Sequence, residues 1–166
     1  WNQINSMWPD ESIKLFGADI DSGTYDYFTE AIIGKARSSR TDFTQSKNHA
    51  ALIDAIVAEK NALGFVNYAY YDENQDKVAA VAINNGTGAV LPSAETVENG
   101  DYQPLSRPIF IYVNIQAAEK PEVKEFVEFY MKNALLIVKE VKLFSLPPRA
   151  YTTMLEHFNK KRTGTV

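Results

Sequence analysis

The chain has 166 residues, of which 45% are hydrophobic and 23% charged, and its formal net charge is −4. That length and apolar content suit one ordinary domain or two small lobes and exclude a disordered chain. The negative charge argues against a nucleic-acid or acidic-membrane binder, because such proteins need a basic field. The lack of cysteine excludes disulfides and thiolate zinc sites, but a small anion can still be bound by neutral donors and an arginine.

The sequence shows no membrane span and no signal peptide. Its longest apolar run, Ala134 to Val138, ends at Lys139 and is too short to cross a bilayer. Residue 1 is Trp rather than Met, so we expect a processed product or a piece of a longer protein, and a leader that has been removed stays open.

The first predicted elements are a strand and a helix joined by a small polar turn. We predict a strand at about Ser12 to Phe16 and a helix from Thr24 to about Ile33, ended by Gly34. A strand that leads into a helix N-terminus is the usual ligand-binding geometry of open α/β sheets.

The turn between them, Asp21-Ser22-Gly23-Thr24, has two interpretations. Its hydroxyls and the backbone amides at the positive end of a helix suit a tetrahedral oxyanion. The same residues also make an ordinary helix cap, and the local pattern alone favours the cap. The turn by itself therefore does not establish a binding site.

The middle of the chain is predicted to alternate helix and strand. We expect, in order, a polar loop at Lys35–Lys47, a helix at about Asn48–Lys60, strands at Gly64–Tyr71 and Val78–Ile83, a turn at Asn84–Gly86, and a short helix after Ser93 that Asn99-Gly100 ends.

The last third is predicted to hold one strand and two helices. The strand, Arg107–Val113, is apolar enough for both faces to be covered. Pro121 opens a long helix that keeps the helical period to Val138, and a last helix runs from about Ala150 to Lys160 after Pro147-Pro148. The alternation makes the fold class α/β, but one strand cannot close a sheet unaided, so this part should lean on another segment or chain.

Five blocks of sequence, taken in order, carry a resemblance to a known family. They are Asp21 to Ala31, Ser39 to Thr44, Asn61 to Phe65 with Tyr68 to Tyr71, Pro104 to Pro108, and Phe126 to Tyr130. The chain resembles the phosphate-binding proteins of ABC transporters, the PstS family, over nearly its whole length. The resemblance implies a periplasmic-binding-protein-like fold of type II, in which two α/β lobes close on one phosphate. Residues 1–104 would be the phosphate-binding second lobe and 105–166 the returning C-terminal part of the first.

The resemblance also implies the site residues. Ser22 and Thr24 would donate hydroxyl hydrogen bonds, and the amides of Gly23 and Thr24 would add more, beside Asp21. An arginine should complete the set. Our first candidate is Arg40, because a guanidinium is the natural bidentate partner of an oxyanion, and Arg37 is second. Asp42 is expected to orient that arginine rather than to touch the ligand.

Three departures from the family pattern limit these expectations. Many members carry the arginine four residues before the serine, where this chain has Ala18. Close relatives have an acidic stretch where this chain has Ser46 to His49. The family's N-terminal segment, which supplies most of the first lobe, is missing, so we expect phosphate binding by this chain alone to be weak or undetectable.

The partners implied by the resemblance are inorganic phosphate and the membrane permease of an ABC importer, with a periplasmic or extracellular location. No cofactor, metal or nucleic acid is expected. Sulfate, arsenate and molybdate remain alternative ligands, because the carboxylate that would accept the proton of phosphate lies in the missing segment.

Two other functions remain open. A phosphatase-like enzyme could use the same turn, but the two histidines, His49 and His157, are far apart and no carboxylate cluster suits a metal. Alternatively, residues 105–166 could mediate self-association or a segment swap, which would cover their apolar surface.

Overall fold

The computed structural model describes residues 1–141 and 143–164. These residues form two compact units. The first contains Trp1–Pro92 and Tyr102–Leu105, and the second contains Ser93–Asp101 and the chain from Ser106 onward. No helix in the described ranges is both long and apolar enough to cross a membrane.

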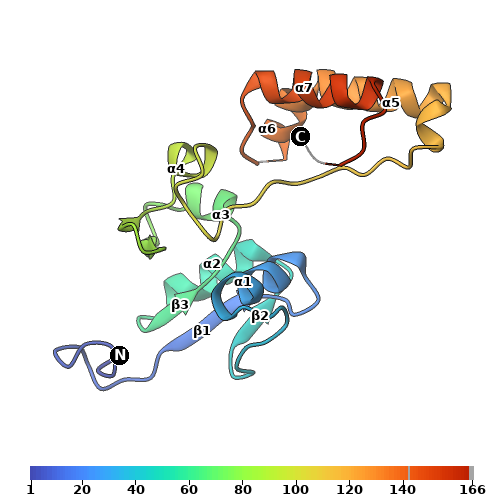
Figure 1. Ribbon diagram of the computed structural model, residues 1–166. Coiled ribbons are helices and arrows are strands. Elements are labelled where there is room, and N and C mark those ends of the chain that lie inside the picture. Colours follow the sequence, from blue (N-terminus) through green and yellow to red (C-terminus); the bar gives the residue numbers. More distant parts are fainter. Residues whose placement is uncertain (142, 165–166) are drawn as a thin grey trace. The chain divides into compact units, whose positions relative to one another are not determined.

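The first unit is built on a parallel sheet of three strands in the order β2-β1-β3, with helices packed on it (Figure 1). Its elements are β1 (Lys14–Ala18), α1 (Gly23–Ile33), β2 (Thr44–Ser46), α2 (His49–Ala58), β3 (Ala62–Gly64), α3 (Tyr68–Asp72), β4 (Ile83–Asn84) and β5 (Ala89–Val90). Because β1 and β2 are parallel, their carboxyl ends meet at one edge of the sheet, and from there the chain enters α1 and α2.

Close packing around β1 explains why a glycine occupies its fourth position. A Cβ atom at Gly17 would come within 2.4 Å of the Phe65 ring. That ring stacks on Phe28 of α1, with centroids 3.9 Å apart, so it is held in place. The buried apolar residues of this unit are Ala18, Tyr25, Leu52 and Ile53. The core therefore joins β1, α1 and α2.

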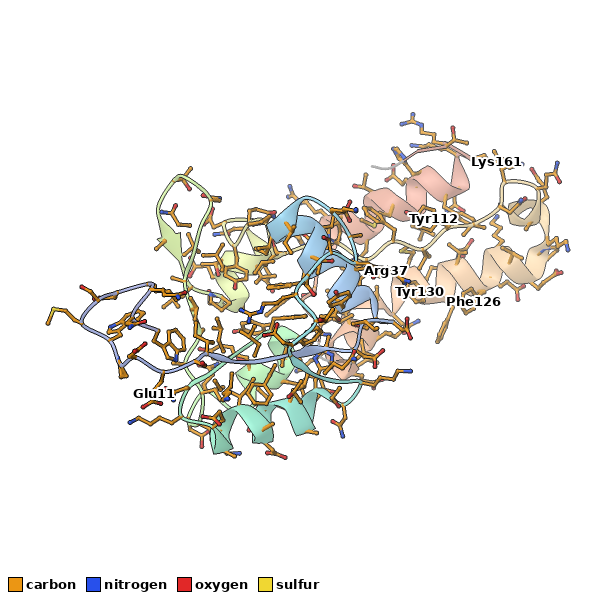
Figure 2. The ribbon with its side chains drawn as sticks, turned by 90° about the horizontal axis from the view of Figure 1, so that it is seen from below. Glu11, Arg37, Tyr112, Phe126, Tyr130 and Lys161 are labelled. Carbon is orange, nitrogen blue, oxygen red and sulfur yellow. The ribbon has the colours of Figure 1, made fainter. Side chains whose placement is uncertain are left out.

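The second unit is helical in its described residues. It contains α4 (Ala94–Glu98), a 3-10 turn η1 (Ala117–Glu119), α5 (Pro121–Lys132), α6 (Ala134–Glu140) and α7 (Pro148–Asn159). Helices α5 and α7 pack together, and the buried apolar residues are Val127 and Ala134. The Phe126 side chain is 62% exposed and points away from α5 (Figure 2).

Several predicted boundaries are confirmed to within two residues. Helix α1 is capped by Ser22 and ends at Gly34, whose φ of 80° is the left-handed conformation that favours glycine. Helix α4 follows Ser93, which forms a capping box with Thr96. Pro148 lies in the first turn of α7, as expected from its missing N–H.

The strand predicted over Gly64–Tyr71 is wrong. Strand β3 ends at Gly64, and Tyr68–Asp72 forms helix α3. The rings of Tyr68 and Tyr71 meet edge to face at 5.7 Å, and the Tyr68 hydroxyl donates to Asp72 at 3.2 Å. These spacings of three and four residues are helical, and they outweigh the aromatic alternation that suggested a strand.

Two further strand predictions are wrong. Of Val78–Ile83 only Ile83 is in a strand, where β4 pairs with the two residues of β5 across the predicted turn. The segment Arg107–Val113 forms no strand and is not covered, since Ile109 is 69% and Tyr112 88% exposed. A strand needs a neighbour to bond with, and the described part of the second unit provides none.

The loop and the long helix also differ from expectation. The predicted loop Lys35–Lys47 contains β2, whose polar residues show no hydrophobic alternation and so gave no strand signal. The long helix divides at Asn133 into α5 and α6. The Asn133 side chain donates to the Phe129 carbonyl at 2.8 Å, and such local bonds compete with the helical ladder.

Candidate anion-binding site

The predicted turn lies at the carboxyl ends of β1 and β2. The Asp19 amide donates to the Ser46 carbonyl at 3.1 Å, and the Ile20 amide donates to the Gln45 side-chain oxygen at 3.0 Å. These two bonds attach the residues before Ser22 to the end of β2. The first turn of α1 is thereby placed at the sheet edge where open α/β sheets bind ligands.

Ser22 is the N-cap of α1 in this structure. Its Oγ accepts from the Tyr25 amide at 3.2 Å and donates to the Asp19 carbonyl at 2.6 Å. The capping interpretation is therefore what the structure shows. A hydroxyl has one proton, so Ser22 could donate to a ligand only by releasing Asp19.

The other residues of the turn are placed around this cap. Gly23 begins α1 and is exposed, while Thr24 is half-buried. Asp21 is exposed, and its amide donates to the Asp19 carboxylate at 3.0 Å. The structure thus brings Asp21, Ser22, Gly23 and Thr24 to one helix start, as predicted. Whether they bind an anion stays a prediction.

Arg37 lies beside α1 (Figure 2). Its Nε donates to Asp26 Oδ1 at 2.9 Å and its Nη2 donates to Oδ2 at 3.3 Å. Its own amide donates to Thr29 Oγ1 at 2.8 Å, which holds the residue at a φ of 59°. The hydrogen bond that Arg37 donates to Asp26 raises the pKa of Arg37 above its ordinary value. This guanidinium is therefore already paired with a carboxylate of the first turn of α1.

Arg40, the first candidate, is paired in the same way. Its Nε and Nη2 donate to the two Asp42 oxygens at 2.6 and 2.5 Å, and both side chains are about two-thirds exposed. The hydrogen bond from Arg40 lowers the pKa of the Asp42 carboxyl. The structure brings Asp42 to Arg40, as the prediction requires, but the role of the pair toward a ligand stays a prediction.

Tyr25 connects the turn to the loop that carries both arginines, and sequence reasoning missed it. Its hydroxyl lies 2.8 Å from Ser39 Oγ, and its ring stacks on Phe43 with centroids 6.0 Å apart. The residue is only 5% exposed. Two of the matched sequence blocks contain these three residues, but their pairing depends on a fold that periodicity does not reveal.

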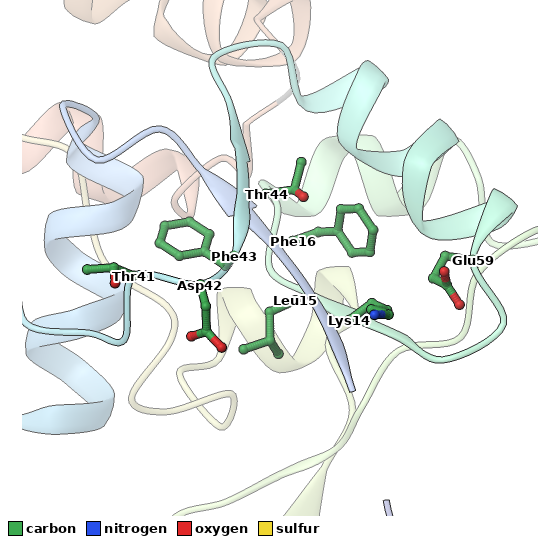
Figure 3. Close-up of a pocket in the computed structure, with 8 residues that line it drawn as sticks. All are labelled: Lys14, Leu15, Phe16, Thr41, Asp42, Phe43, Thr44 and Glu59. Atoms are coloured by element: carbon green, nitrogen blue, oxygen red, sulfur yellow. The ribbon is translucent and has the colours of Figure 1, made fainter. Parts of the chain in front are cut away.

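An open depression of about 350 Å³ lies elsewhere in this unit (Figure 3). It is lined by Lys14, Leu15, Phe16, Thr41, Asp42, Phe43, Thr44 and Glu59. Phe16 pairs with Thr44, the first residue of β2, so the depression is at the amino half of these strands. Of the candidate residues only Asp42 lines it. The helix start at Ser22 is therefore at the opposite edge of the sheet from this depression, whereas the Arg40–Asp42 pair borders it.

The two histidines belong to different units. His49 begins α2, and its Nδ1 accepts from the Asn67 amide at 3.0 Å, so that nitrogen carries no proton. Burial lowers the pKa of His49. His157 belongs to α7 of the second unit. Among the described residues no group of three His, Asp or Glu is placed to hold a metal ion.

Comparison with known proteins identifies relatives over the whole chain. It is 45% identical to protein SphX of Synechocystis sp. across all of its length and 50% of that protein. It is 30% identical to the phosphate-binding protein PstS of Staphylococcus epidermidis, covering 94% of this chain and 47% of that one. The chain thus spans about half the length of these relatives.

Solved structures show the same fold. The crystal structure of a possible phosphate-binding protein from Planctomyces limnophilus superposes with a TM-score of 0.87 at 43% identity, over 98% of this chain and 58% of that one. PstS of Borrelia burgdorferi, at 21% identity, shares the fold with a TM-score of 0.63. A family profile described as the PBP superfamily domain matches residues 1–134. The chain therefore belongs to the PBP superfamily and has its α/β fold, as the sequence predicted.

Proposed function

We propose that this chain is part of a binding protein for inorganic phosphate and that the start of α1 provides one side of the site. The observation that supports this most directly is the placement of Ser22, Gly23 and Thr24 at the carboxyl edge of the parallel sheet. Two relatives that match 94% and 98% of this chain are named a phosphate-binding protein and a possible phosphate-binding protein.

The chemistry of the helix start fits a phosphate ion. Backbone N–H groups at a helix N-terminus point along the positive end of its dipole. The Ser22 and Thr24 hydroxyls add neutral donors without a fixed counter-charge. To bind phosphate, Ser22 would exchange its bond with the Asp19 carbonyl for one with the ligand, so one protein acceptor returns to water. This exchange limits the net gain from the hydroxyl to that of an ordinary hydrogen bond.

An arginine completes the proposed site, and Arg40 remains the first candidate with Arg37 second. Each guanidinium is bound by a carboxylate, Asp42 or Asp26, on the exposed surface. Exposed ion pairs are screened by solvent and contribute little to stability, so a phosphate can share or displace such a partner. The short Arg40–Asp42 pair leaves the planar guanidinium oriented for a second, bidentate partner.

In the intact protein, residues 1–104 would form the phosphate-binding second lobe and residues 105–166 the return into the first. We propose that this protein delivers phosphate to the permease of an ABC importer from the periplasm or the cell surface. The function proposed is binding without catalysis. Sulfate, arsenate and molybdate are alternative ligands that competition with phosphate would test.

The test is a phosphate titration of this chain followed by amide NMR, which detects weak binding. We expect a saturable response with wild type, a weaker one with Ser22→Ala and Thr24→Val, and no change with Ser93→Ala. Ser93 is the matched control, because it caps α4 in the second unit with the same chemistry. Equal affinity in all four proteins would overturn the assignment of the site. A parallel titration with sulfate measures the selectivity.

A further inference from the structure

One face of α1 holds the loop that carries both candidate arginines. Tyr25, Asp26 and Thr29 are the residues that contact it. Thr29 Oγ1 accepts from the Arg37 amide, Asp26 accepts from the Arg37 guanidinium, and Tyr25 contacts Ser39 and Phe43. Thr29 and Tyr25 are only 1% and 5% exposed. An exposed loop is therefore attached to a buried part of the helix.

The direction of the hydrogen bonds at Ser39 follows from counting protons. Ser39 Oγ lies 2.8 Å from the Arg40 carbonyl, which can only accept, so the serine proton is donated there. The same Oγ lies 2.8 Å from the Tyr25 hydroxyl. Because the serine has no second proton, Tyr25 is the donor in that contact. The chain of bonds runs from Tyr25 through Ser39 to the backbone of Arg40.

Tyr25 also contacts the chain that follows Arg40 and the first turn of α1. Its ring stacks on Phe43 with an interplanar angle of 10°, so Ser39 and Phe43, which flank Arg40, are attached to one aromatic side chain. Its own amide donates to Ser22 Oγ at 3.2 Å. Tyr25, a single buried residue, thus contacts Ser22 and also the two residues that enclose the Arg40 segment (residues 40–42), Ser39 and Phe43.

We infer that Tyr25 is a positioning residue of the anion site, which holds the Arg40 segment through Ser39 and Phe43 while its backbone binds Ser22. This inference rests on the proposed function. Tyr25 does not contact the ligand. Its hydroxyl restricts the loop, so that less conformational entropy is lost when Arg40 engages an anion.

The experiment removes the hydroxyl and keeps the ring. Tyr25→Phe keeps the ring stacking on Phe43 and the hydrogen bond from the backbone amide to Ser22 Oγ. It removes only the hydroxyl that donates to Ser39. We expect phosphate affinity to fall by about threefold to tenfold, as for the loss of one net hydrogen bond. The matched control is Tyr27→Phe, because Tyr27 lies on the same helix but its hydroxyl donates to the Pro104 carbonyl. The control should bind phosphate like wild type.

A double-mutant cycle separates positioning from a general structural effect. If Tyr25 acts through Arg40, then Tyr25→Phe should have no further effect on phosphate affinity once Arg40→Gln is present. A structural defect would instead lower the affinity equally in both backgrounds. Additive losses, or an unchanged affinity in Tyr25→Phe, would overturn the positioning role while the proposed function stands.

A second readout needs no ligand. Backbone ¹⁵N order parameters for residues 38–42 should fall in Tyr25→Phe, while the Arg37 amide, which Thr29 holds, should keep its value. If wild type gives no detectable response to phosphate, the start of α1 does not bind phosphate without the rest of the first lobe, and this readout alone decides whether Tyr25 orders the loop. Unchanged order parameters for residues 38–42 would overturn the inference in either case.

Discussion

The two units of this chain differ in how far they complete their own structure. In the first, the central strand β1 has a neighbour on each side, and the turn beyond it is bonded to β2. In the second, the apolar segment Arg107–Val113, which was predicted to be a strand, has no strand partner among the described residues, and Tyr112 is 88% exposed. Apolar sequence therefore produces a strand only where the chain also supplies the neighbour.

The difference also locates the candidate site. The first unit contains the helix start and both candidate arginines, all attached by hydrogen bonds that the unit provides for itself. The exposed apolar residues of the second unit, among them Ile109 and Phe126, are those we expect the remainder of a longer protein or a second copy to cover.

The sharpest way to test this comparison is a matched pair of leucine truncations. Leu52 of α2 is 1% exposed, whereas Leu136 of α6 is 59% exposed. Leu52→Ala should lower the free energy of unfolding by about 2–5 kcal/mol through lost burial and a cavity. Leu136→Ala should change it by less than about 0.5 kcal/mol. Urea denaturation measures both, and similar losses would show that the second unit is as well packed as the first.

A second prediction concerns the close packing at β1. Gly17→Ala should lower the free energy of unfolding by about 1–3 kcal/mol, because the new methyl group meets the Phe65 ring that stacks on Phe28. The added Phe65→Leu substitution should recover part of the loss by removing the ring. Thermal denaturation of the three proteins checks this, and a Gly17→Ala protein as stable as wild type would refute the packing account.

A third prediction separates capping from ligand binding at Ser22. Ser22→Ala should lower the free energy of unfolding by about 1 kcal/mol, because the Tyr25 amide loses its acceptor. Ser22→Asp should restore this stability, since aspartate is an equally good cap, but should abolish phosphate binding by charge repulsion. A Ser22→Asp protein that binds phosphate normally would place the site elsewhere.

The smallest predicted effect is a pH dependence from His49. Burial lowers its pKa in the folded state, so below the ordinary value of about 6.5 the unfolded chain binds the proton first. Stability of the first unit should therefore be highest above that pH and fall as the pH is lowered toward the folded-state pKa. Protonation of Nδ1 would also remove the acceptor of the Asn67 amide.

Denaturation of wild type and His49→Asn between pH 7.5 and 5 measures this effect. The variant should lose part of the wild-type decline in stability. An identical decline in both proteins would assign the pH dependence to other groups.

What the sequence could predict was decided by local chemistry. Capping and breaking residues such as Ser22, Gly34, Ser93 and Pro148 gave helix ends that are correct to within two residues, because their effects act within one turn of the chain. Matched sequence blocks in order also indicated the family, which the comparisons show.

What it could not predict depends on partners distant in sequence. The polar strand β2 exists because β1 lies beside it. The predicted strand at Arg107–Val113 does not form, because the described residues of its unit provide no strand to pair with it. The candidate site shows the same limit. The turn at Ser22 could be proposed from its residues, but the bonds from Tyr25 to Ser39 and from Ile20 to Gln45 cross 14 and 25 positions of sequence.

The most direct measurement is to map which amides respond when inorganic phosphate is added to the ¹⁵N-labelled chain. The account predicts saturable shifts centred on Gly23, Thr24 and Tyr25, with a smaller response at Arg40 and none in the second unit. Shifts that instead centre on the depression around Leu15 and Phe43, or that increase linearly without saturation across the surface, would contradict a phosphate site at the start of α1.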